Sequence, residues 1–247
     1  MEWNIEFIDK NSFKNHVKKT IETYGSTLKS IDLKKFNSNI VDPIKFTFDS
    51  KVYNKSIEQI IIDEIARQRD KSNTNAIGYF HQNMFRYLEN CEVPEHVWDV
   101  VFHRNDGITF YVEMKNKHNT MNSSSSQKTY MKMQNQIINK NDCICCLVEV
   151  IAKKSQNIVW SVSLDGQNVS AERIRRISID KFYEMVTGIP NAFKQICDVL
   201  PSVIEEIISE YDNLQIEEDT VISELRRINP DLLKALYLLA FKTYEGF

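Results

Sequence analysis

Residues 98–115, WDVVFHRNDGITFYVEMK, decide the fold of this chain, because they predict a β-hairpin. On both sides of Asn105–Gly107 the residues are β-branched, aromatic or alternating, as in strands, and Asn-Asp-Gly is a turn signal. A three-residue loop with its glycine in the left-handed conformation fixes the register. That register places Asp99 directly opposite Glu113, with the two Cβ atoms about 5 Å apart.

The period-two alternation of strands divides this hairpin into two faces. One face is apolar and is expected to meet the core. The other face carries the following side chains: Asp99, Val101, His103, Thr109, Tyr111, Glu113 and Lys115. Two facing carboxylates repel each other unless a cation lies between them, and hard oxygen ligands suit Mg²⁺. A cross-strand salt-bridge cluster on the solvent side of the hairpin is the other interpretation, and alternation alone does not separate the two.

The pattern Asp99, thirteen residues, Glu113-Met-Lys115 resembles the catalytic signature of the PD-(D/E)XK nuclease superfamily. Trp98 stands where that signature has proline, a residue that many members also lack. The resemblance implies that Asp99, Glu113 and the backbone carbonyl of Met114 bind Mg²⁺. It also implies that Lys115 holds or deprotonates the attacking water and offsets charge on the phosphate.

Longer segments sharpen the resemblance. Four of them are similar to type II restriction endonucleases that cut the interrupted palindrome GGNCC: residues 33–43, 78–83, 112–123 and 149–157. The similarity extends from about residue 25 to about residue 205. It implies a sequence-specific, Mg²⁺-dependent deoxyribonuclease of a restriction-modification system, which hydrolyses one phosphodiester bond in each strand of double-stranded DNA. Cutting both strands of a two-fold symmetric site requires two active sites, which implies a homodimer.

Two alternatives stand beside this interpretation. A DNA repair or junction-resolving nuclease would use the same superfamily chemistry on another substrate. A non-catalytic DNA-binding module would have the fold without turnover. The presence of Asp99, Glu113 and Lys115 together argues against the second alternative, because an inactive relative need not retain all three.

A further metal ligand is expected from the helix that precedes the hairpin, since many members of the superfamily supply a carboxylate there. Glu64 is the candidate, because it lies at the edge of the buried stripe formed by Ile60, Ile61 and Ile65. Asp63 is the competitor. A solvated acid on the helix surface is the structural alternative for either residue.

Eight residues are candidates for DNA contacts: Asn116, Lys117, His118, Asn119, Ser123, Lys128, Arg173 and Arg175. Asn116 to Asn119 follow the catalytic strand directly, so they are expected near the scissile phosphate or the bases. Residues 123–126 are serines that could cap a helix and also present amides to a phosphate. Arg173 and Arg175 could read guanine, which arginine contacts bidentately, and salt bridges to acidic helices explain them equally well.

The charge of the chain is segregated. Among 247 residues the formal net charge is -3, which by itself gives no sign of a nucleic-acid partner. Residues 113–140, however, hold five lysines and one acid, and residues 173–176 hold three arginines. This distribution fits a DNA-binding face better than the total does.

The five cysteines show neither a Cys-x-x-Cys pair nor a zinc-ligand spacing, which indicates reduced thiols and a cytoplasmic protein. The sequence shows no secretory signal at its N-terminus. Its longest apolar stretch, residues 232–241, is too short to span a bilayer.

The rest of the chain predicts a mixed α/β fold in one domain, residues 1–247. Helices are expected at 12–35, 56–70, 78–90, 123–139, 179–186 and 191–209, strands at 144–152, 157–164 and 169–177, and loops at 71–75 and 215–219. With the hairpin, residues 56–152 have the α-β-β-α-β order of a restriction-endonuclease-like core, with a central mixed sheet flanked by helices. A second hairpin (157–177) and a helical C-terminal part (179–247), whose last helical pair is broken at Asn229-Pro230, follow this core.

Overall fold

The computed structural model describes residues 3–211 and 215–245 and divides the chain into two compact units. The first, which we call the sheet unit, comprises Met1–Thr20 and Ile77–Glu210. The second, which we call the helical unit, comprises Ile21–Ala76 and Tyr211–Phe247. The expectation that the whole chain is one endonuclease domain stays a prediction.

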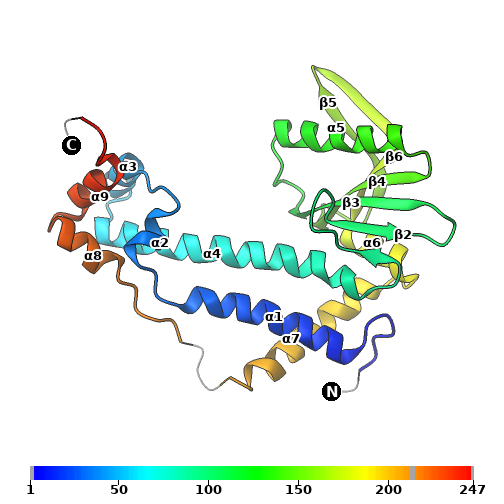
Figure 1. The fold of residues 1–247 in the computed structure, drawn as a ribbon, viewed down its shortest axis with the longest axis horizontal. Helices are drawn as coiled ribbons and strands as arrows, with labels where there is room; N and C mark the ends of the chain where they lie inside the picture. Colours follow the sequence, from blue (N-terminus) through cyan, green and yellow to red (C-terminus); the bar gives the residue numbers. More distant parts are fainter. Residues whose placement is uncertain (1–2, 212–214, 246–247) are drawn as a thin grey trace. The chain divides into compact units, whose positions relative to one another are not determined.

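A mixed six-stranded sheet with the order β1-β2-β3-β4-β6-β5 organises the sheet unit (Figure 1). β3 and β4 pair in parallel, as do β4 and β6, whereas the other neighbours are antiparallel. The strands are β1 Cys91–Glu92, β2 Val100–His103, β3 Thr109–Lys117, β4 Cys143–Ile151, β5 Asn157–Leu164 and β6 Gln167–Ser178. The second hairpin therefore forms where the sequence predicts it, around Asp165-Gly166.

The helices that belong to the sheet unit are η1 Phe85–Tyr87, α5 Ser123–Asn139, α6 Ile179–Thr187 and α7 Ala192–Ile208. Two long helices, α1 Lys10–Leu28 and α4 Ile57–Met84, have residues in both units. In chain order α4, β2, β3, α5 and β4 give the predicted α-β-β-α-β arrangement. The mixed sheet flanked by helices is consistent with the expected restriction-endonuclease-like fold.

The hairpin formed by β2 and β3 has the predicted register. Val100 pairs with Val112 and His103 pairs with Thr109, so the next position along each strand brings Asp99 beside Glu113. Gly107 adopts φ 89°, a left-handed conformation that a side chain would strain. The turn thus fixes which residues of the two strands face each other.

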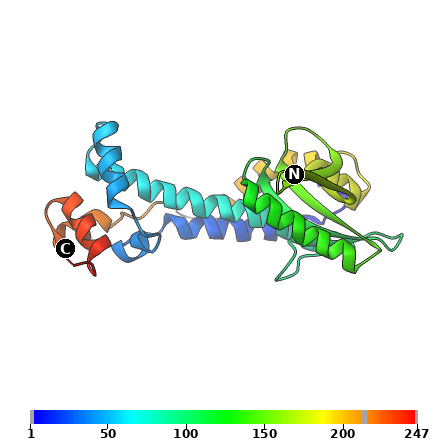
Figure 2. The ribbon, with the colours of Figure 1, turned by 90° about the horizontal axis from the view of Figure 1, so that it is seen from above.

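The face of the hairpin that carries the carboxylates is partly covered: Val101 is buried, Tyr111, Glu113 and Lys115 are half-buried, and His103 is exposed. Helix α5 contacts β4, β5 and β6 and lies along the sheet (Figure 2). Its buried stripe packs with side chains of the strands in one cluster, which includes Tyr130, Met133, Ile137, Val101, Cys145, Leu147, Trp160 and Ile174. A charged residue on this face therefore borders the hydrophobic core on one side, which raises the free-energy cost of leaving it unpaired.

The helical unit has its own core. Its remaining helices are α2 Leu33–Asn37, α3 Pro43–Val52, α8 Val221–Ile228 and α9 Leu232–Phe241, which pack with the first part of α4. Buried residues of this core include Phe36, Phe46, Ile61, Leu225 and Leu236. The predicted break at Asn229-Pro230 separates α8 from α9, and the Asp231 side chain caps α9 by accepting from two backbone amides.

Three expectations about helices are wrong. The single helix expected at 12–35 is interrupted, because α1 ends at Leu28 and α2 begins at Leu33. Residues 71–75 belong to one continuous helix, α4, instead of a loop, because the buried positions Ala76, Phe80 and Met84 continue the helical spacing past the polar stretch. The serines do not cap α5; Asn122 does, by accepting a hydrogen bond from the amide of Ser125. Helix α3 was also not anticipated.

All five cysteines are unpaired, and the three on β4, Cys143, Cys145 and Cys146, are buried. Burial raises the pKa of the Cys145 thiol to about 12, so this group stays protonated. Within residues 3–211 and 215–245, no helix combines the length and the apolar character needed to cross a lipid bilayer.

Candidate active site

Asp99 and the Glu113-Met-Lys115 segment come together at one end of the β2–β3 hairpin. The Oδ2 atom of Asp99 accepts a hydrogen bond from the backbone amide of Met114 at 2.7 Å. The Nζ atom of Lys115 donates to Oε1 of Glu113, also at 2.7 Å. The structure thus brings the three predicted catalytic side chains into one cluster, at the place that the hairpin register dictates.

A second lysine enters this cluster from α5. The Nζ atom of Lys132 donates to Oε2 of Glu113 at 2.8 Å and to the carbonyl of Val97. It also lies 4.0 Å from the ring centroid of Trp98, within the range of a cation–π interaction. Glu113 therefore has an ammonium on each oxygen, one from its own strand and one from the helix that covers the sheet.

The two carboxyl groups of the cluster are perturbed in opposite directions. Burial, and repulsion from Glu113, raise the pKa of Asp99, although the Met114 amide opposes this. Burial also acts to raise the pKa of Glu113, but hydrogen bonds from Lys115 and Lys132 outweigh it, and the net pKa is lowered. Lys115 and Lys132 thus neutralise Glu113, whereas Asp99 has no ion-pair partner of its own among the described residues.

The chemistry of these donors fits a hard divalent cation. Asp99 and Glu113 offer carboxylate oxygens. Met114, between Glu113 and Lys115 on β3, offers its backbone carbonyl, while its side chain is buried in the core, as predicted. Within the described part of the chain no three His, Cys, Asp or Glu side chains gather as a metal site. Two carboxylates with a backbone carbonyl, completed by water or phosphate, are a common set for Mg²⁺.

Glu64 lies on α4 in the helical unit. Its carboxylate accepts from Arg67 at 2.6 Å and from Gln68 at 2.9 Å. Burial acts to raise its pKa, but these two partners outweigh it and the net pKa is lowered. The part of α4 in the sheet unit, residues 77–84, contains no acidic residue. A ligand role for Glu64 stays a prediction, with an ion pair inside its own helix as the observed arrangement.

The residues after the catalytic strand occupy the end of β3 and the turn that follows. Lys117 and Asn119 are exposed, whereas Asn116 is half-buried, with its side-chain amide close to Gly78 of α4. His118 donates its backbone amide to the carbonyl of Ile151, which fastens the end of β3 to β4. Of this group, Lys117 and Asn119 are the side chains that solvent reaches most freely.

The remaining DNA-contact candidates lie on α5 and β6. Ser123 and Lys128 are exposed on α5. Arg173 donates to three carbonyls at the end of α5, those of Ile137, Lys140 and Asn141. Arg175 donates to the backbone and side chain of Asn157 on β5. These arginines thus bind neighbouring segments of the sheet unit, and the expected salt bridges to the acidic helices do not account for them.

Sequence reasoning missed a buried ion pair next to Lys115. Glu149 is 2% exposed, lies beside Lys115 in the β3–β4 register, and accepts from Arg176 at 3.0 Å. The signal was an acid inside the apolar run of β4, where a charged residue is rare unless it is paired. Lys132 was one of five lysines in the basic run, and its spacing along the sequence gave no reason to single it out.

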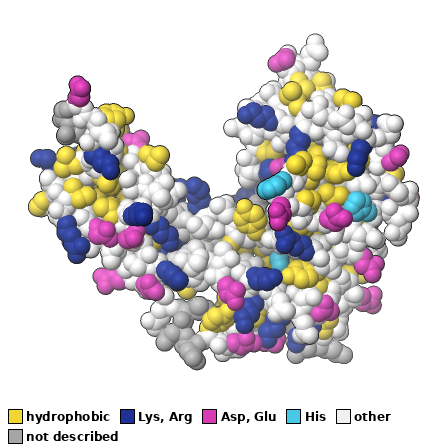
Figure 3. Space-filling view, viewed as in Figure 1, with side chains coloured by type: hydrophobic (Ala, Val, Ile, Leu, Met, Phe, Trp, Pro, Cys, Tyr) yellow, Lys and Arg dark blue, Asp and Glu magenta, His cyan; other side chains and the backbone are white. Residues whose placement is uncertain are grey.

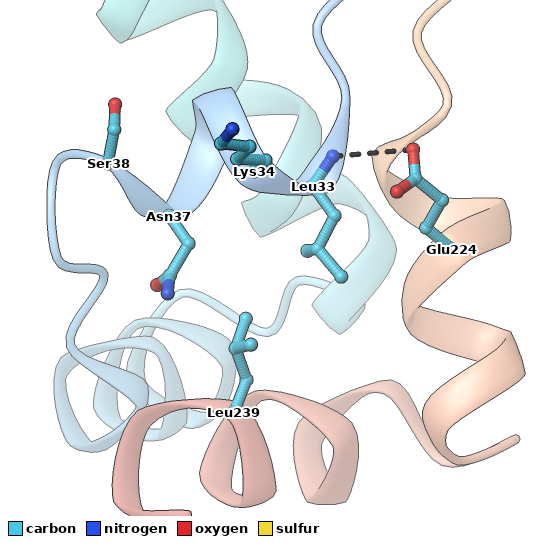
Figure 4. Close-up of a pocket in the computed structure, with 6 residues that line it drawn as sticks. All are labelled: Leu33, Lys34, Asn37, Ser38, Glu224 and Leu239. Carbon is cyan, nitrogen blue, oxygen red and sulfur yellow. Dashed lines mark hydrogen bonds between the residues drawn. The ribbon is translucent and has the colours of Figure 1, made fainter.

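A hollow of about 520 Å³ in the helical unit does not involve any of these residues. It is lined by Leu33, Lys34, Asn37, Ser38, Glu224 and Leu239 (Figure 4). The amide of Leu33 donates to Glu224 at 3.3 Å across one side of it. Its lining contains no pair of carboxylates, so it offers none of the chemistry assembled at the hairpin.

Comparison with known proteins adds an independent observation. The family model described as Eco47II restriction endonuclease matches residues 5–209. The type II restriction enzyme Sau96I of Staphylococcus aureus is 33% identical over 193 residues, which are 75% of this chain and 74% of that enzyme. The type II restriction enzyme Eco47II of Escherichia coli is 29% identical over 215 residues, which are 83% of this chain and 89% of that enzyme.

The matched region contains the whole hairpin and the Asp99–Glu113–Lys115 cluster. Type II restriction enzymes are site-specific deoxyribonucleases that act on double-stranded DNA and generally use a divalent metal ion. The chain belongs to the Eco47II restriction endonuclease family and is a type II restriction endonuclease.

Proposed function

We propose that this endonuclease is Mg²⁺-dependent, cleaves GGNCC and acts as a homodimer with one hairpin site in each subunit. The observation that supports the chemistry is the pair of carboxylates on neighbouring strands beside Lys115. Family membership decides against a repair nuclease and a non-catalytic module as the main function.

Each residue of the cluster has a role in this proposal. Asp99 and Glu113, with the Met114 carbonyl, hold the metal ion. When bound, Mg²⁺ polarises the phosphate and lowers the pKa of the attacking water. Lys115 stabilises the charge that develops on the phosphate, because its ammonium lies beside Glu113 on the same strand, next to the metal position.

Specificity for GGNCC rests on the similarity of residues 33–43, 78–83, 112–123 and 149–157 to enzymes that cut this site. Lys117 and Asn119 are the exposed side chains of the right type next to the catalytic strand. To read bases, Arg173 and Arg175 would have to give up their hydrogen bonds to backbone carbonyls and donate to guanine instead. A symmetric site read by two identical subunits accounts for tolerance at the central base pair.

The test uses two synthetic duplexes, one with a single GGNCC site and one in which a single G·C pair of that site is changed to A·T. We expect Mg²⁺-dependent cleavage of the first duplex alone, with common ends on sequencing. Asp99→Asn and Glu113→Gln should abolish cleavage while the circular dichroism spectrum stays unchanged.

Asp106→Asn is the matched control, because Asp106 is an exposed acid in the turn of the same hairpin. Full activity in a folded Asp99 or Glu113 variant would refute the metal site. Cleavage of both duplexes would refute the specificity and leave the chemistry in place.

A further inference from the structure

Lys132 reaches the active site from a different element than the catalytic triad of side chains. Asp99, Glu113 and Lys115 come from the hairpin, whereas Lys132 comes from α5, seventeen positions further along the chain than Lys115. Its ammonium contacts Glu113 Oε2 at 2.8 Å, the Val97 carbonyl and the face of Trp98. Lys132 therefore contacts three groups: the carboxylate of Glu113 on β3, and the Val97 carbonyl and Trp98 ring that directly precede Asp99.

These contacts are built into the fold. The ring of Trp98 is 7% exposed and packs 5.4 Å from the ring of Tyr111 on β3. Val97 adopts φ 75°, a strained conformation that a β-branched residue rarely adopts. The rotation of α5 is set by the fully buried Met133 next to Lys132. The position of the Lys132 ammonium is thus determined by the core rather than by a flexible surface chain.

The two lysines on Glu113 are not equivalent. Lys115 and Glu113 are neighbours on one face of β3, and among the described residues the Lys115 ammonium is held by one hydrogen bond, to Glu113 Oε1. Lys132 has two additional partners besides Glu113, so it loses more if it leaves. Of the two carboxylate oxygens, Oε1 is consequently the one that can exchange its partner, and Oε2 is the one that stays bound.

We propose that Lys132 is a positioning residue of the active site. It holds Glu113 through Oε2, so that the other oxygen, Oε1, faces the metal position. Lys115 is then the lysine that leaves Glu113 and turns toward the phosphate. This inference rests on the proposed Mg²⁺-dependent function. It assigns to α5 a part in catalysis that the D…ExK pattern does not contain.

The experiment compares Lys132→Gln and Lys132→Arg with the control Lys194→Gln, an exposed lysine on α7 of the same unit. Calorimetric titration with Ca²⁺ in the absence of DNA measures cation affinity without turnover. Cleavage at increasing Mg²⁺ gives kcat, KM for DNA and the Mg²⁺ concentration at half-maximal rate. Thermal unfolding shows whether each variant is folded.

We expect Lys132→Gln to weaken Ca²⁺ binding and to raise the half-maximal Mg²⁺ concentration about tenfold, with lower kcat and nearly unchanged KM. Lys132→Arg should recover part of the loss, and Lys194→Gln should behave as wild type. Unchanged cation affinity in folded Lys132→Gln, or a loss confined to KM, would overturn the proposal. If wild-type enzyme cleaves without any divalent ion, the proposed function fails and the proposal for Lys132 falls with it, whereas the first two results leave that function standing.

A separate observation in the helical unit concerns the outer side of α3. Ile44, Phe48 and Val52 follow each other at four-residue spacing and are 49%, 67% and 69% exposed. The inner side of the helix is occupied, since Phe46 is buried and Thr47 is hydrogen-bonded to Tyr237 of α9 at 3.0 Å. Figure 3 shows hydrophobic side chains on the surface of the helical unit in the region of α3 and α9.

Ile40, three residues before the start of α3, is a further exposed apolar side chain. It is 86% exposed and has φ 49°, so the chain places a large apolar side chain in solvent at the cost of backbone strain. The exposed parts of Ile40, Ile44, Phe48 and Val52 amount to on the order of 500 Å². This is close to the apolar part of one side of a standard-size protein interface, about 800 Å² per partner.

The stripe is also self-complementary. Within α3, Ile44 and Val52 lie four residues on either side of Phe48, and Lys45 and Asp49, an ion pair on α3, line one flank. In a two-fold contact of antiparallel α3 helices, this flank meets the same flank of the other subunit. Lys45 then lies near the acid of the other subunit and Asp49 near its lysine. We infer that the α3 stripe is an interface with a second copy of this chain, which gives the proposed homodimer its contact surface.

The test is the mass of the full chain in solution, by light scattering and by sedimentation over a range of concentrations. We expect a dimer for the wild type, a monomer for Phe48→Glu and a dimer for Ile138→Glu, a control at an equally exposed apolar residue of α5. Circular dichroism verifies the fold of each variant. A monomeric wild type, or a Phe48→Glu variant that stays dimeric, would overturn the interface. Cleavage by wild type at GGNCC would keep the proposed chemistry in either case.

Discussion

Asp99 and Glu113 are both carboxylic acids on neighbouring strands, and their surroundings shift their pKa values in opposite directions. The pKa of Asp99 is higher in the folded protein than in the unfolded chain. As the pH rises above the ordinary pKa of an aspartate, ionisation of Asp99 therefore lowers the free energy of unfolding. The pKa of Glu113 is lower in the folded protein than in the unfolded chain. Its ion pairs therefore stabilise the fold at a pH above the ordinary pKa of a glutamate, and this stabilisation is lost as the pH falls through the pKa of the folded state.

Neutral variants of these two acids should therefore change stability in opposite directions. Without divalent ions at pH 7, Asp99→Asn is expected to raise the melting temperature, and Glu113→Gln is expected to lower it by leaving Lys115 and Lys132 unpaired. Both differences should narrow as the pH falls through the carboxyl range. Thermal unfolding followed by circular dichroism in EDTA measures this, and shifts of the same sign would show that the assigned environments are incorrect.

Lys115 should affect rate more than binding. If its ammonium meets charge that develops only in the transition state, Lys115→Ala loses about two or more orders of magnitude in single-turnover cleavage, with a much smaller change in DNA affinity. Affinity is measured with Ca²⁺ in place of Mg²⁺. Lys117→Ala, at the exposed end of the same strand, is the matched control and should affect affinity instead. Parallel losses of rate and affinity would make Lys115 an ordinary phosphate contact.

The sequence predicts the residues of the cluster that share the hairpin, because alternation and a turn determine which of them face each other. It does not predict Lys132, since the rotation of α5 against the sheet depends on how Tyr130 and Met133 pack. The same holds for Arg176, which pairs with Glu149 across two strands that are far apart in the chain. Contacts within a supersecondary unit are readable from sequence, and contacts between units depend on the core.

At the scale of elements, α5 begins at a single side-chain cap. Asn122 accepts from the Ser125 amide at 2.8 Å, and replacing such a residue by alanine costs about 1 kcal/mol. Asn122→Ala should therefore lower the free energy of unfolding by about this amount in urea. Ser123→Ala, one position inside the helix, should be nearly neutral. A larger effect at Ser123 would mean that the serines cap the helix after all.

Most strands and helices begin and end within a few residues of where the sequence predicts them. Hydrophobic periodicity and turn residues such as Gly107 and Gly166 mark them locally. The failure at residues 71–75 has a clear cause: polar composition resembles a loop, but Ala76, Phe80 and Met84 give α4 a buried side further along. Local composition cannot reveal a helix whose stability comes from packing one turn away.

At the scale of the whole molecule, DNA affinity should depend steeply on salt although the net charge is -3. Exposed lysines such as Lys117 and Lys128 release counterions when they meet phosphates, independently of the total charge. Fluorescence anisotropy with a labelled duplex in Ca²⁺ between 50 and 200 mM salt should show a loss of roughly a hundredfold or more, and Lys128→Ala should flatten the slope. A salt-independent affinity would contradict an electrostatic docking face.

The pairing of the hairpin determines where this enzyme family can tolerate an insertion. Opposed residues of the hairpin point to the same side, so one residue inserted within a strand between Asp99 and Glu113 would shift the register and place Asp99 on the side of Met114, away from Glu113 and Lys115. Residues inserted in the turn itself would only lengthen the loop and leave the strand pairs in place. Among related sequences, differences in the distance from the aspartate to the glutamate should therefore fall in the turn, and a single-residue insertion within a strand should survive only together with a compensating bulge.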